Sequence, residues 1–291
     1  MRVVRRPTAP LRLDDDLLVE GDNAAVLGLL PEGAFDLIYV DPPFNTGQER
    51  RGSRLRVVRD EEGDRTGFGG HRYRSERVEA PGAYADRFDD YAGWLVPRLV
   101  AAHRLLAPHG SMYVHLDHRE SHYVKVALDG ALGRDRFLNE IVWAYDYGGK
   151  SRSRWPAKHD TILVYVAEPG RHHFDADAIE REPYLAPALA GAEKAARGKR
   201  PTDVLWHTIV PTNGAERTGY PTQKPEGLIR RFVQASSRPG GWCLDFFAGS
   251  GTLGAVCGGL DRRYVLVDSS PEAIAVAEAR LSRLAVPLRQ A

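Results

Sequence analysis

The sequence predicts an α/β fold of the doubly wound kind, with helices on both faces of a mostly parallel sheet. Seven short apolar runs alternate along the chain with longer stretches that suit helices. Continuous apolar runs are typical of strands that are buried on both faces. The runs cover residues 17–19, 36–40, 111–116, 141–145, 161–167, 242–247 and 263–268.

Four of the intervening stretches carry helix signals. Asp22 can cap a helix over residues 23–30. Residues 91–106 have an apolar stripe at helical spacing. Helices over 225–236 and 271–284 each begin with proline, which is favoured in the first turn.

The composition excludes several classes of protein. The chain has 291 residues, 43% of them hydrophobic, so it can bury a core and is not expected to be disordered. No long uncharged apolar run occurs, and no apolar core follows the basic N-terminus, so we expect neither a membrane span nor a signal peptide. Cys243 and Cys257 are too few for a disulfide scaffold, which favours a cytoplasmic protein.

Two stretches depart from the alternation of strands and helices. Residues 45–88 are an Arg- and Gly-rich insertion loop, and residues 170–219 are mixed, with an Ala-rich helix expected over 187–196. Loops of this length within a compact domain are usually functional. We therefore expect a single domain over residues 1–291 that carries two functional excursions.

Basic residues are clustered although the formal net charge is +1. Such clusters suit contacts to a nucleic-acid backbone, but acidic residues interrupt the first one, and solvated loop charge is the alternative. The clusters are Arg50, Arg51, Arg54, Arg56 and Arg59; Lys150, Arg152, Arg154 and Lys158; and Lys194, Arg197, Lys199 and Arg200.

The most informative short motif follows the run at 36–40 and reads Asp41-Pro42-Pro43-Phe44. Proline pairs are common in turns, so these four letters by themselves also fit a plain turn after a strand. Their position favours function, because ligands of open α/β sheets lie at the carboxyl ends of strands. We take the motif as the candidate catalytic site.

A glycine-rich loop follows the run that begins at Trp242. It reads Asp245-Phe246-Phe247-Ala248-Gly249-Ser250-Gly251-Thr252, and its glycines permit a close backbone approach. The loop is shorter than a dinucleotide fingerprint and lacks the Lys-Ser/Thr ending of a phosphate-binding loop. The next predicted strand ends at Asp268, where an acid can accept hydrogen bonds from ribose hydroxyls.

These motifs together resemble the β-class amino DNA methyltransferases, in which the catalytic motif precedes the cofactor loop. Four further segments agree with this family, and their sequences most resemble those of the modification subunits of type III restriction systems. Those subunits are longer, and here residues 170–219 are the available target-recognition segment. The agreeing segments begin at Gly21-Asp22-Asn23, His115-Leu116-Asp117, Lys158-His159-Asp160 and Glu216-Arg217-Thr218.

The resemblance implies S-adenosylmethionine as the cofactor, double-stranded DNA as the substrate, and a permuted, Rossmann-like sheet of seven strands. The glycine-rich loop and Asp268 would hold the cofactor, together with Thr222 and Lys224 from the segment before the helix at 225–236. Asp22 would lie near the cofactor's adenine, or it serves as a helix cap alone.

The chemistry implied for Asp41 is activation of an exocyclic amine. The amine lone pair is delocalised into the base, so a carboxylate and the Pro42 carbonyl must draw the nitrogen towards tetrahedral geometry. Positive charge is then stabilised where it develops. Phe44 offers a ring on which an extruded base can stack.

We therefore predict transfer of a methyl group to N6 of a flipped adenine. The alternatives are N4 of cytosine, an RNA base or protein amide, and a non-catalytic DNA-binding module. A homodimer and a restriction subunit are candidate partners, and no set of residues has the spacing of a metal site. One aromatic residue among Trp143, Tyr145, Tyr147 and Trp155 is expected to stack on DNA or on the flipped base.

Overall fold

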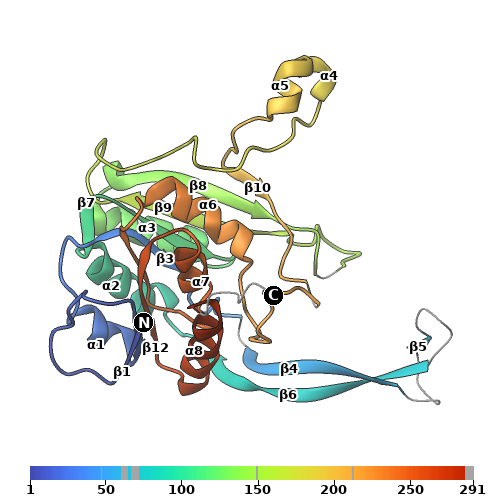
Figure 1. Ribbon diagram of the computed structural model, residues 1–291, viewed down its shortest axis with the longest axis horizontal. Coiled ribbons are helices and arrows are strands. Elements are labelled where there is room, and N and C mark those ends of the chain that lie inside the picture. The colour runs from blue at the N-terminus through green and yellow to red at the C-terminus, as the bar shows by residue number, and fades with distance from the viewer. Residues whose placement is uncertain (47, 60–64, 67–71, 149, 212, 286–291) are drawn as a thin grey trace, which may run out of the picture.

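The computed structural model describes residues 1–46, 48–59, 65–66, 72–148, 150–211 and 213–285 (Figure 1). Its centre is a nine-stranded sheet in the order β1-β2-β12-β11-β3-β7-β9-β8-β10. The strands are β1 (Arg2–Arg5), β2 (Leu17–Glu20), β3 (Phe35–Val40), β7 (Leu106–Leu116), β8 (Phe137–Ala144), β9 (His159–Val166), β10 (Val204–Trp206), β11 (Trp242–Asp245) and β12 (Arg263–Asp268).

Each of the seven predicted runs overlaps a strand of this sheet. The predicted count of seven strands was wrong, because β1 and β10 add one strand at each edge. Both are short, and most of their residues are partly or fully exposed. Edge strands of this kind carry little sequence signal, because one side of the strand faces no neighbour.

The strands run parallel except for β9, which is antiparallel to both of its neighbours, β7 and β8. Parallel strands bring their carboxyl ends to one edge of the sheet. Since β9 runs the other way, its first residues, His159 and Asp160, lie at that same edge. The chain order reverses between the neighbours β11 and β3, which makes this position the topological switch point.

Three helices cover each face of the sheet. Alternate residues of β3 point to opposite faces, so Ile38 packs with α1, α2 and α3, whereas Leu37 packs with α6, α7 and α8. The helices are α1 (Asn23–Leu27), α2 (Tyr91–His103), α3 (Ser121–Leu132), α6 (Glu226–Ser236), α7 (Thr252–Gly258) and α8 (Pro271–Ala285). A 3₁₀ helix over Arg134–Arg136 joins α3 to β8.

Several element boundaries differ from the sequence prediction. Helix α1 ends at Leu27 instead of Leu30, and α2 ends at His103 because β7 already begins at Leu106. Helix α3 was not predicted at all; its partly exposed apolar residues, such as Tyr123, blur the helical pattern. None of these changes moves a residue of the predicted site.

The expected insertion loop contains regular structure. Strands β4 (Gln48–Arg59) and β6 (Arg72–Asp86) form a long antiparallel ribbon, to which β5 (Arg65–Thr66) pairs. The ribbon projects away from the sheet and its helices (Figure 1). The expectation of an irregular loop was therefore wrong for the residues of β4 and β6. Their high content of Gly and Arg gave no recognisable strand pattern in the sequence.

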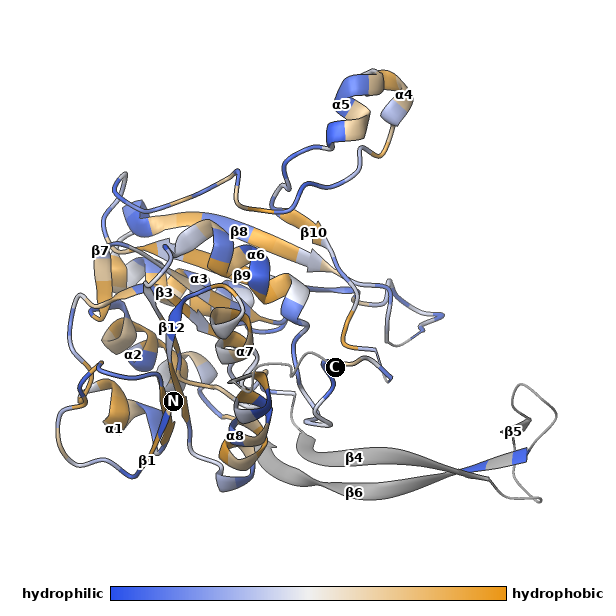
Figure 2. Ribbon diagram, viewed as in Figure 1, coloured by the Kyte–Doolittle hydropathy of each residue, from blue (hydrophilic) through white to orange (hydrophobic). Residues whose placement is uncertain are grey.

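The second excursion carries two short helices, α4 (Pro187–Ala190) and α5 (Ala192–Arg197), where one helix was predicted. Gly191 separates them with a φ of +80°, a left-handed value that ends the first helix. These helices stand apart from the body, and their hydrophobic residues are not part of the core (Figure 2). Within the described ranges, no helix has the length and apolar character needed to cross a membrane.

Candidate active site

Asp41 directly follows β3 at the carboxyl edge of the sheet. Its side chain is 15% exposed, and its Oδ2 accepts a hydrogen bond from the ammonium group of Lys224. Its Oδ1 is buried and finds no hydrogen-bond partner among the described residues. A buried acceptor without a donor is costly, so this oxygen is suited to receive an N–H group from a ligand.

The end of the motif is held by Asn45, which adopts a left-handed φ of +53°. Its side-chain amide donates to Glu120 at 2.7 Å and accepts from the backbone N–H of Phe88 at 2.9 Å. The ring of Phe44 lies 5.7 Å from that of His115. These contacts fix the exit of the chain from the motif, where the β4–β6 ribbon begins.

Two cavities meet at Asp41. The large cavity, of about 1240 Å³, is lined by Pro42, Phe44 and Asp160, and the small cavity, of about 290 Å³, by the glycine-rich loop. Both are lined by Asp41 and Lys224. The predicted site residues that line one or both cavities are Asp22, Asp41, Pro42, Pro43, Phe44, Thr222, Lys224, Asp245, Phe246, Phe247, Ala248, Gly249, Ser250, Thr252 and Asp268.

Asp268 organises the wall of the small cavity. Its two carboxylate oxygens accept backbone N–H bonds from Gly249 at 2.8 Å and from Ser270 at 2.9 Å. Burial raises the pKa of Asp268, and these hydrogen bonds oppose the rise. Each oxygen has a further lone pair, so the carboxylate can still accept from a ligand hydroxyl.

Gly251 supports the glycine-rich loop without lining either cavity. Its φ is +74°, and a Cβ placed on it would lie 3.0 Å from the Cβ of Ala277 in α8. Both observations make an ordinary side chain strained here. Gly251 therefore allows α7 and α8 to pack closely, which sets the position of the loop.

A buried arginine that the sequence did not reveal locks the other side of this loop. Arg280 of α8 is 4% exposed and donates to the Ser250 carbonyl at 3.2 Å, to Thr252 Oγ1 at 3.0 Å and to Glu226 at 2.6 Å. In the sequence, Arg280 is one charged residue on an amphipathic helix. Its burial depends on α6, α7 and α8 packing together.

Asp245 and Asp22 have structural contacts of their own. Asp245 accepts from the Phe247 N–H at 2.9 Å, and burial raises the pKa of this carboxyl group well above its usual range. Asp22 accepts from the Ala25 N–H at 3.1 Å as the cap of α1 and also lines the small cavity. The two interpretations of Asp22 are thus compatible.

An aromatic wall closes the small cavity on the side of α2. The rings of Phe88 and Trp94 lie 4.4 Å apart, Trp94 lies 5.7 Å from Phe247, and the guanidinium of Arg98 lies 4.7 Å from the Trp94 ring. Phe88, Trp94 and Arg98 all line this cavity. From the sequence, Trp94 was assigned to the apolar stripe of a helix, and no sequence signal indicated that it lines a cavity.

A buried hydrogen-bonded chain lies below the large cavity. Tyr39 Oη bonds to His115 Nδ1 at 2.8 Å, and His115 Nε2 bonds to Asp160 Oδ2 at 3.1 Å. Tyr145 Oη donates to Asp160 Oδ1 at 3.1 Å. The chain links β3, β7, β9 and the end of β8, so it fixes these strand ends beneath Asp41.

Asp160 is ionised within this chain at neutral pH. Burial alone would raise its pKa, but the hydrogen bond and charge of His115, the Lys224 charge and the Tyr145 hydrogen bond bring the pKa below its ordinary value. A lowered carboxyl pKa stabilises the folded protein above the unfolded value of 3.8, and this contribution is lost as pH falls through the lower, folded value.

We expect Asp160→Ala to lower the free energy of unfolding at pH 7 by about 3 kcal/mol, because His115 and Tyr145 lose a buried charged partner. Denaturant unfolding measures this difference, which should shrink only below pH 3.8. Asp177→Ala is the control, because Asp177 also has a lowered pKa through Arg200 but is fully exposed. An equal loss in both variants would contradict the structural role of the chain.

The four aromatic residues singled out in the sequence have different environments. Trp143 is buried and donates to the His207 carbonyl at 2.7 Å, so it belongs to the core. Tyr145 is held by Asp160. Tyr147 is 67% exposed and lines the large cavity, and Trp155 is 96% exposed.

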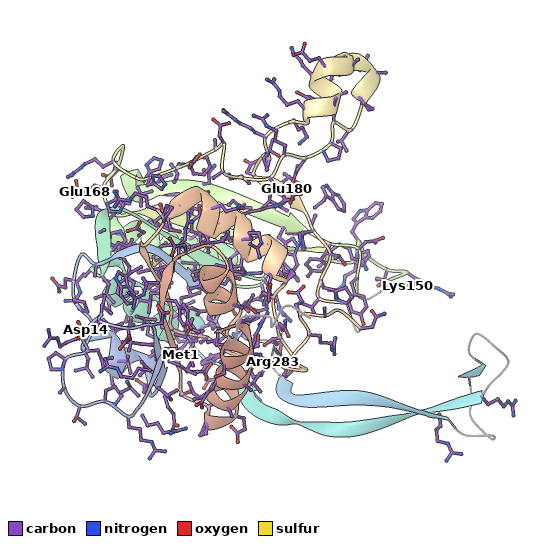
Figure 3. The ribbon with its side chains drawn as sticks, viewed as in Figure 1. Met1, Asp14, Lys150, Glu168, Glu180 and Arg283 are labelled. Carbon is purple, nitrogen blue, oxygen red and sulfur yellow. The ribbon has the colours of Figure 1, made fainter. Side chains whose placement is uncertain are left out.

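Trp155 lies on a basic loop between Gly148 and Ala157, two residues that line the large cavity. Ser151 Oγ accepts from the N–H groups of Ser153 and Arg154, each at 3.2 Å, and shapes the turn before Trp155. Lys158 Nζ donates to the Gly148 carbonyl at 3.2 Å and closes the base of the loop. Figure 3 shows Lys150 reaching outward from this segment, as a contact to a charged partner would require.

Across the described ranges, no group of three or more His, Cys, Asp or Glu residues is arranged to hold a metal ion.

The chain matches one protein-family model, described as DNA methylase, over residues 35–279. It is similar to the type II methyltransferase M.HpaI of Haemophilus parainfluenzae, with 30% identity over 92% of this chain and 74% of that protein. It is also similar to the DNA adenine methyltransferase YhdJ of Escherichia coli K12, with 29% identity over 91% of this chain and 82% of that protein.

Solved structures resemble the fold as well. The PvuII DNA methyltransferase, described as cytosine-N4-specific, superposes with a TM-score of 0.64 over 94% of this chain and 87% of that chain. The two sequences are 16% identical, so this likeness concerns the fold alone. It agrees with the doubly wound, mostly parallel sheet described above.

Proposed function

Because the chain belongs to the N6/N4 DNA methylase family, we propose that it transfers a methyl group from S-adenosylmethionine to N6 of a flipped adenine in double-stranded DNA. The observation that carries the proposal is the position of Asp41. It stands where the two cavities meet, with a buried Oδ1 that has no hydrogen-bond partner among the described residues.

The small cavity suits the cofactor. Asp268 offers its remaining lone pairs to ribose hydroxyls, and Gly249 allows close approach through its left-handed φ of +48°. Phe88 and Trp94 give the cavity an apolar aromatic wall against which an adenine ring can pack. The bound cofactor supplies an electrophilic methyl group on a positively charged sulfur, which becomes a neutral thioether when the methyl group leaves.

The large cavity suits the target base. Asp41 Oδ1 and the Pro42 carbonyl can accept the two N–H bonds of an exocyclic amine and expose its lone pair to the small cavity. The nitrogen gains the methyl group through that lone pair and then loses a proton to Asp41 or to water. The Asp41 charge stabilises the positive nitrogen in between, and Phe44 provides a ring for stacking.

Adenine is the proposed target because the motif begins with Asp41, whereas serine in this place is the pattern of cytosine enzymes. N4 of cytosine remains the second candidate, since the family includes both activities and the PvuII enzyme is described as cytosine-N4-specific. Both targets present an exocyclic amine, so the chemistry at Asp41 is shared.

Single-molecule sequencing of DNA from a methylation-free host that expresses this chain tests the proposal. We expect N6-methyladenine in a defined sequence motif and its absence with an Asp41→Ala control. N4-methylcytosine alone would support the second candidate. No modified base, from a protein that binds S-adenosylmethionine, would overturn DNA as the substrate and favour RNA or a protein amide.

We propose that the exposed loop around Trp155 and the excursion at 170–219 contact the DNA. Basic residues in both segments can bind phosphates.

We propose that the reaction takes place in the cytoplasm, because Cys243 and Cys257 are buried and form no disulfide. A homodimer and a restriction subunit are further partners to test, by light scattering and by co-purification.

Trp155→Ala should weaken binding to duplex DNA about tenfold, because base–aromatic stacking contributes about 1–3 kcal/mol. Trp155→Phe should retain most of the affinity, since it keeps an aromatic face. Fluorescence anisotropy at one fixed salt concentration measures both. Tyr123→Ala is the matched control, because Tyr123 is an aromatic residue on α3 that is 70% exposed; an equal loss in this variant would contradict a specific role for Trp155.

A further inference from the structure

Lys224 lies at the junction of the two cavities and lines both of them. Its ammonium group pairs with Asp41 Oδ2 and lies 4.8 Å from the centre of the Phe44 ring. Its side chain is 12% exposed. The two residues of the catalytic motif that should receive the target base are therefore both in contact with a resident cation.

The backbone of Lys224 is anchored while its side chain spans the junction. Thr252 Oγ1, in the first turn of α7, donates to the Lys224 carbonyl at 3.3 Å, and Pro225 begins the cap of α6. The main chain is thus tied to the glycine-rich loop. A lysine has a flexible four-carbon stem, so its ammonium group can move without any change in this backbone.

The surroundings of this ammonium group are those of a cation site. Asp41 supplies a carboxylate, and Phe44 supplies the negative face of an aromatic ring. Asp160 adds negative charge, and the Lys224 charge acts on this carboxyl group. Removal of Lys224 would leave a concentration of negative charge at the point where the two cavities join.

We propose that Lys224 acts as a movable counter-ion that occupies the transfer point in the empty enzyme and yields it to the positively charged methyl donor. The inference rests on the proposed function, because direct transfer requires the donor sulfur and the acceptor amine to meet beside Asp41. A cation held at that point repels a charged sulfur, whereas it tolerates the neutral thioether of the product.

The consequence is a charge-dependent selection between cofactor forms. With Lys224 paired to Asp41, the product form can bind beside the intact ion pair. When the donor form binds, the ammonium group of Lys224 is displaced from Asp41. The Asp41 carboxylate then faces the sulfonium charge in place of the ammonium group. Lys224 is therefore a positioning residue. Its effect must appear in the ratio of the affinity for the charged donor to the affinity for the neutral product.

Lys224→Met tests this directly. We measure, by calorimetry, the affinity for S-adenosylmethionine, for the neutral S-adenosylhomocysteine, and for sinefungin, which carries a cationic amine in place of the sulfonium. Relative to the neutral ligand, both cationic ligands should bind about tenfold tighter in the variant than in the wild type, because an unscreened like charge is removed. Lys224→Arg keeps the charge and should leave the ratio near the wild-type value.

Lys125→Met is the matched control. Lys125 in α3 also pairs with a carboxylate, Asp129, and lies 4.1 Å from the centre of a phenylalanine ring, Phe137, but it lines neither cavity. This substitution should leave the ratio of affinities unchanged. The reverse charge change, Asp41→Asn, should shift the ratio in the opposite direction and favour the neutral ligand.

An unchanged ratio of affinities in Lys224→Met would overturn the inference. Equal changes for all three ligands would make Lys224 an ordinary contact, and no change for any of them would remove its role altogether. If the wild type binds none of the three ligands, the proposed function fails instead. The melting temperature of each variant shows whether a change in affinity reflects loss of folded protein.

Discussion

Asp41→Ala is expected to lower kcat for methyl transfer by about 1000-fold, the scale of losing a group that stabilises developing charge. The variant removes the carboxylate that accepts an amine N–H bond and that balances the positive nitrogen. Single-turnover methylation of a duplex that contains the recognition sequence measures the effect. The affinity for the cofactor should change far less, because Asp268 and the glycine-rich loop are left intact.

Asp41→Asn separates the charge of this residue from its shape. The amide oxygen keeps one acceptor for the target amine but carries no charge, so kcat should remain at least about 100-fold below wild type. A near-wild-type kcat in this variant would show that hydrogen bonding alone activates the amine. A loss confined to KM would assign Asp41 to binding rather than to catalysis.

Gly251→Ala should destabilise the fold and weaken the cofactor site together. A left-handed alanine costs about 1–2 kcal/mol, and its Cβ would lie 3.0 Å from the Cβ of Ala277. We therefore expect the free energy of unfolding to fall by about 2 kcal/mol and cofactor affinity to fall at least tenfold, because α7 must move away from α8. Denaturant unfolding and calorimetry measure the two effects.

Gly258→Ala is the control within the same helix. Gly258 is the last residue of α7 and lacks a left-handed φ. A Cβ placed on it would have no other atom within 4 Å. Alanine should therefore leave cofactor affinity unchanged and the fold unchanged or slightly more stable, since alanine restricts the unfolded chain. If both glycine variants bind the cofactor equally well, the close approach at Gly251 does not control the site.

The central sheet could be predicted because its signals are local. Each of the seven predicted strands carries an apolar run, and each run is bounded by polar or turn-forming residues. Strands β1 and β10 contain only two and three apolar residues, pair on one side and stay partly exposed. The ribbon of β4 and β6 lies outside the apolar sheet, and its sequence resembles that of a charged loop.

The catalytic motif and the glycine-rich loop were also predicted as places where a ligand binds, because each follows a strand directly. The hydrogen-bonded chain through His115 and Asp160 was beyond reach of the sequence. It depends on the antiparallel direction of β9 and on its register with β7, where His115 pairs with Ile162. Neither the direction nor the register is encoded in either segment alone.

The sequence by itself determined the strand order along the chain, the motif at Asp41 and the loop at Gly249, because strand burial and backbone clearance select residues locally. The tertiary structure decided which side chains meet. Lys224 and Asp41 are 183 positions apart, yet they form an ion pair, since Thr252 of α7 holds the Lys224 carbonyl and the preceding strand, β11, is the neighbour of β3. Contacts across such distances depend on the packing of whole elements, which no short segment specifies.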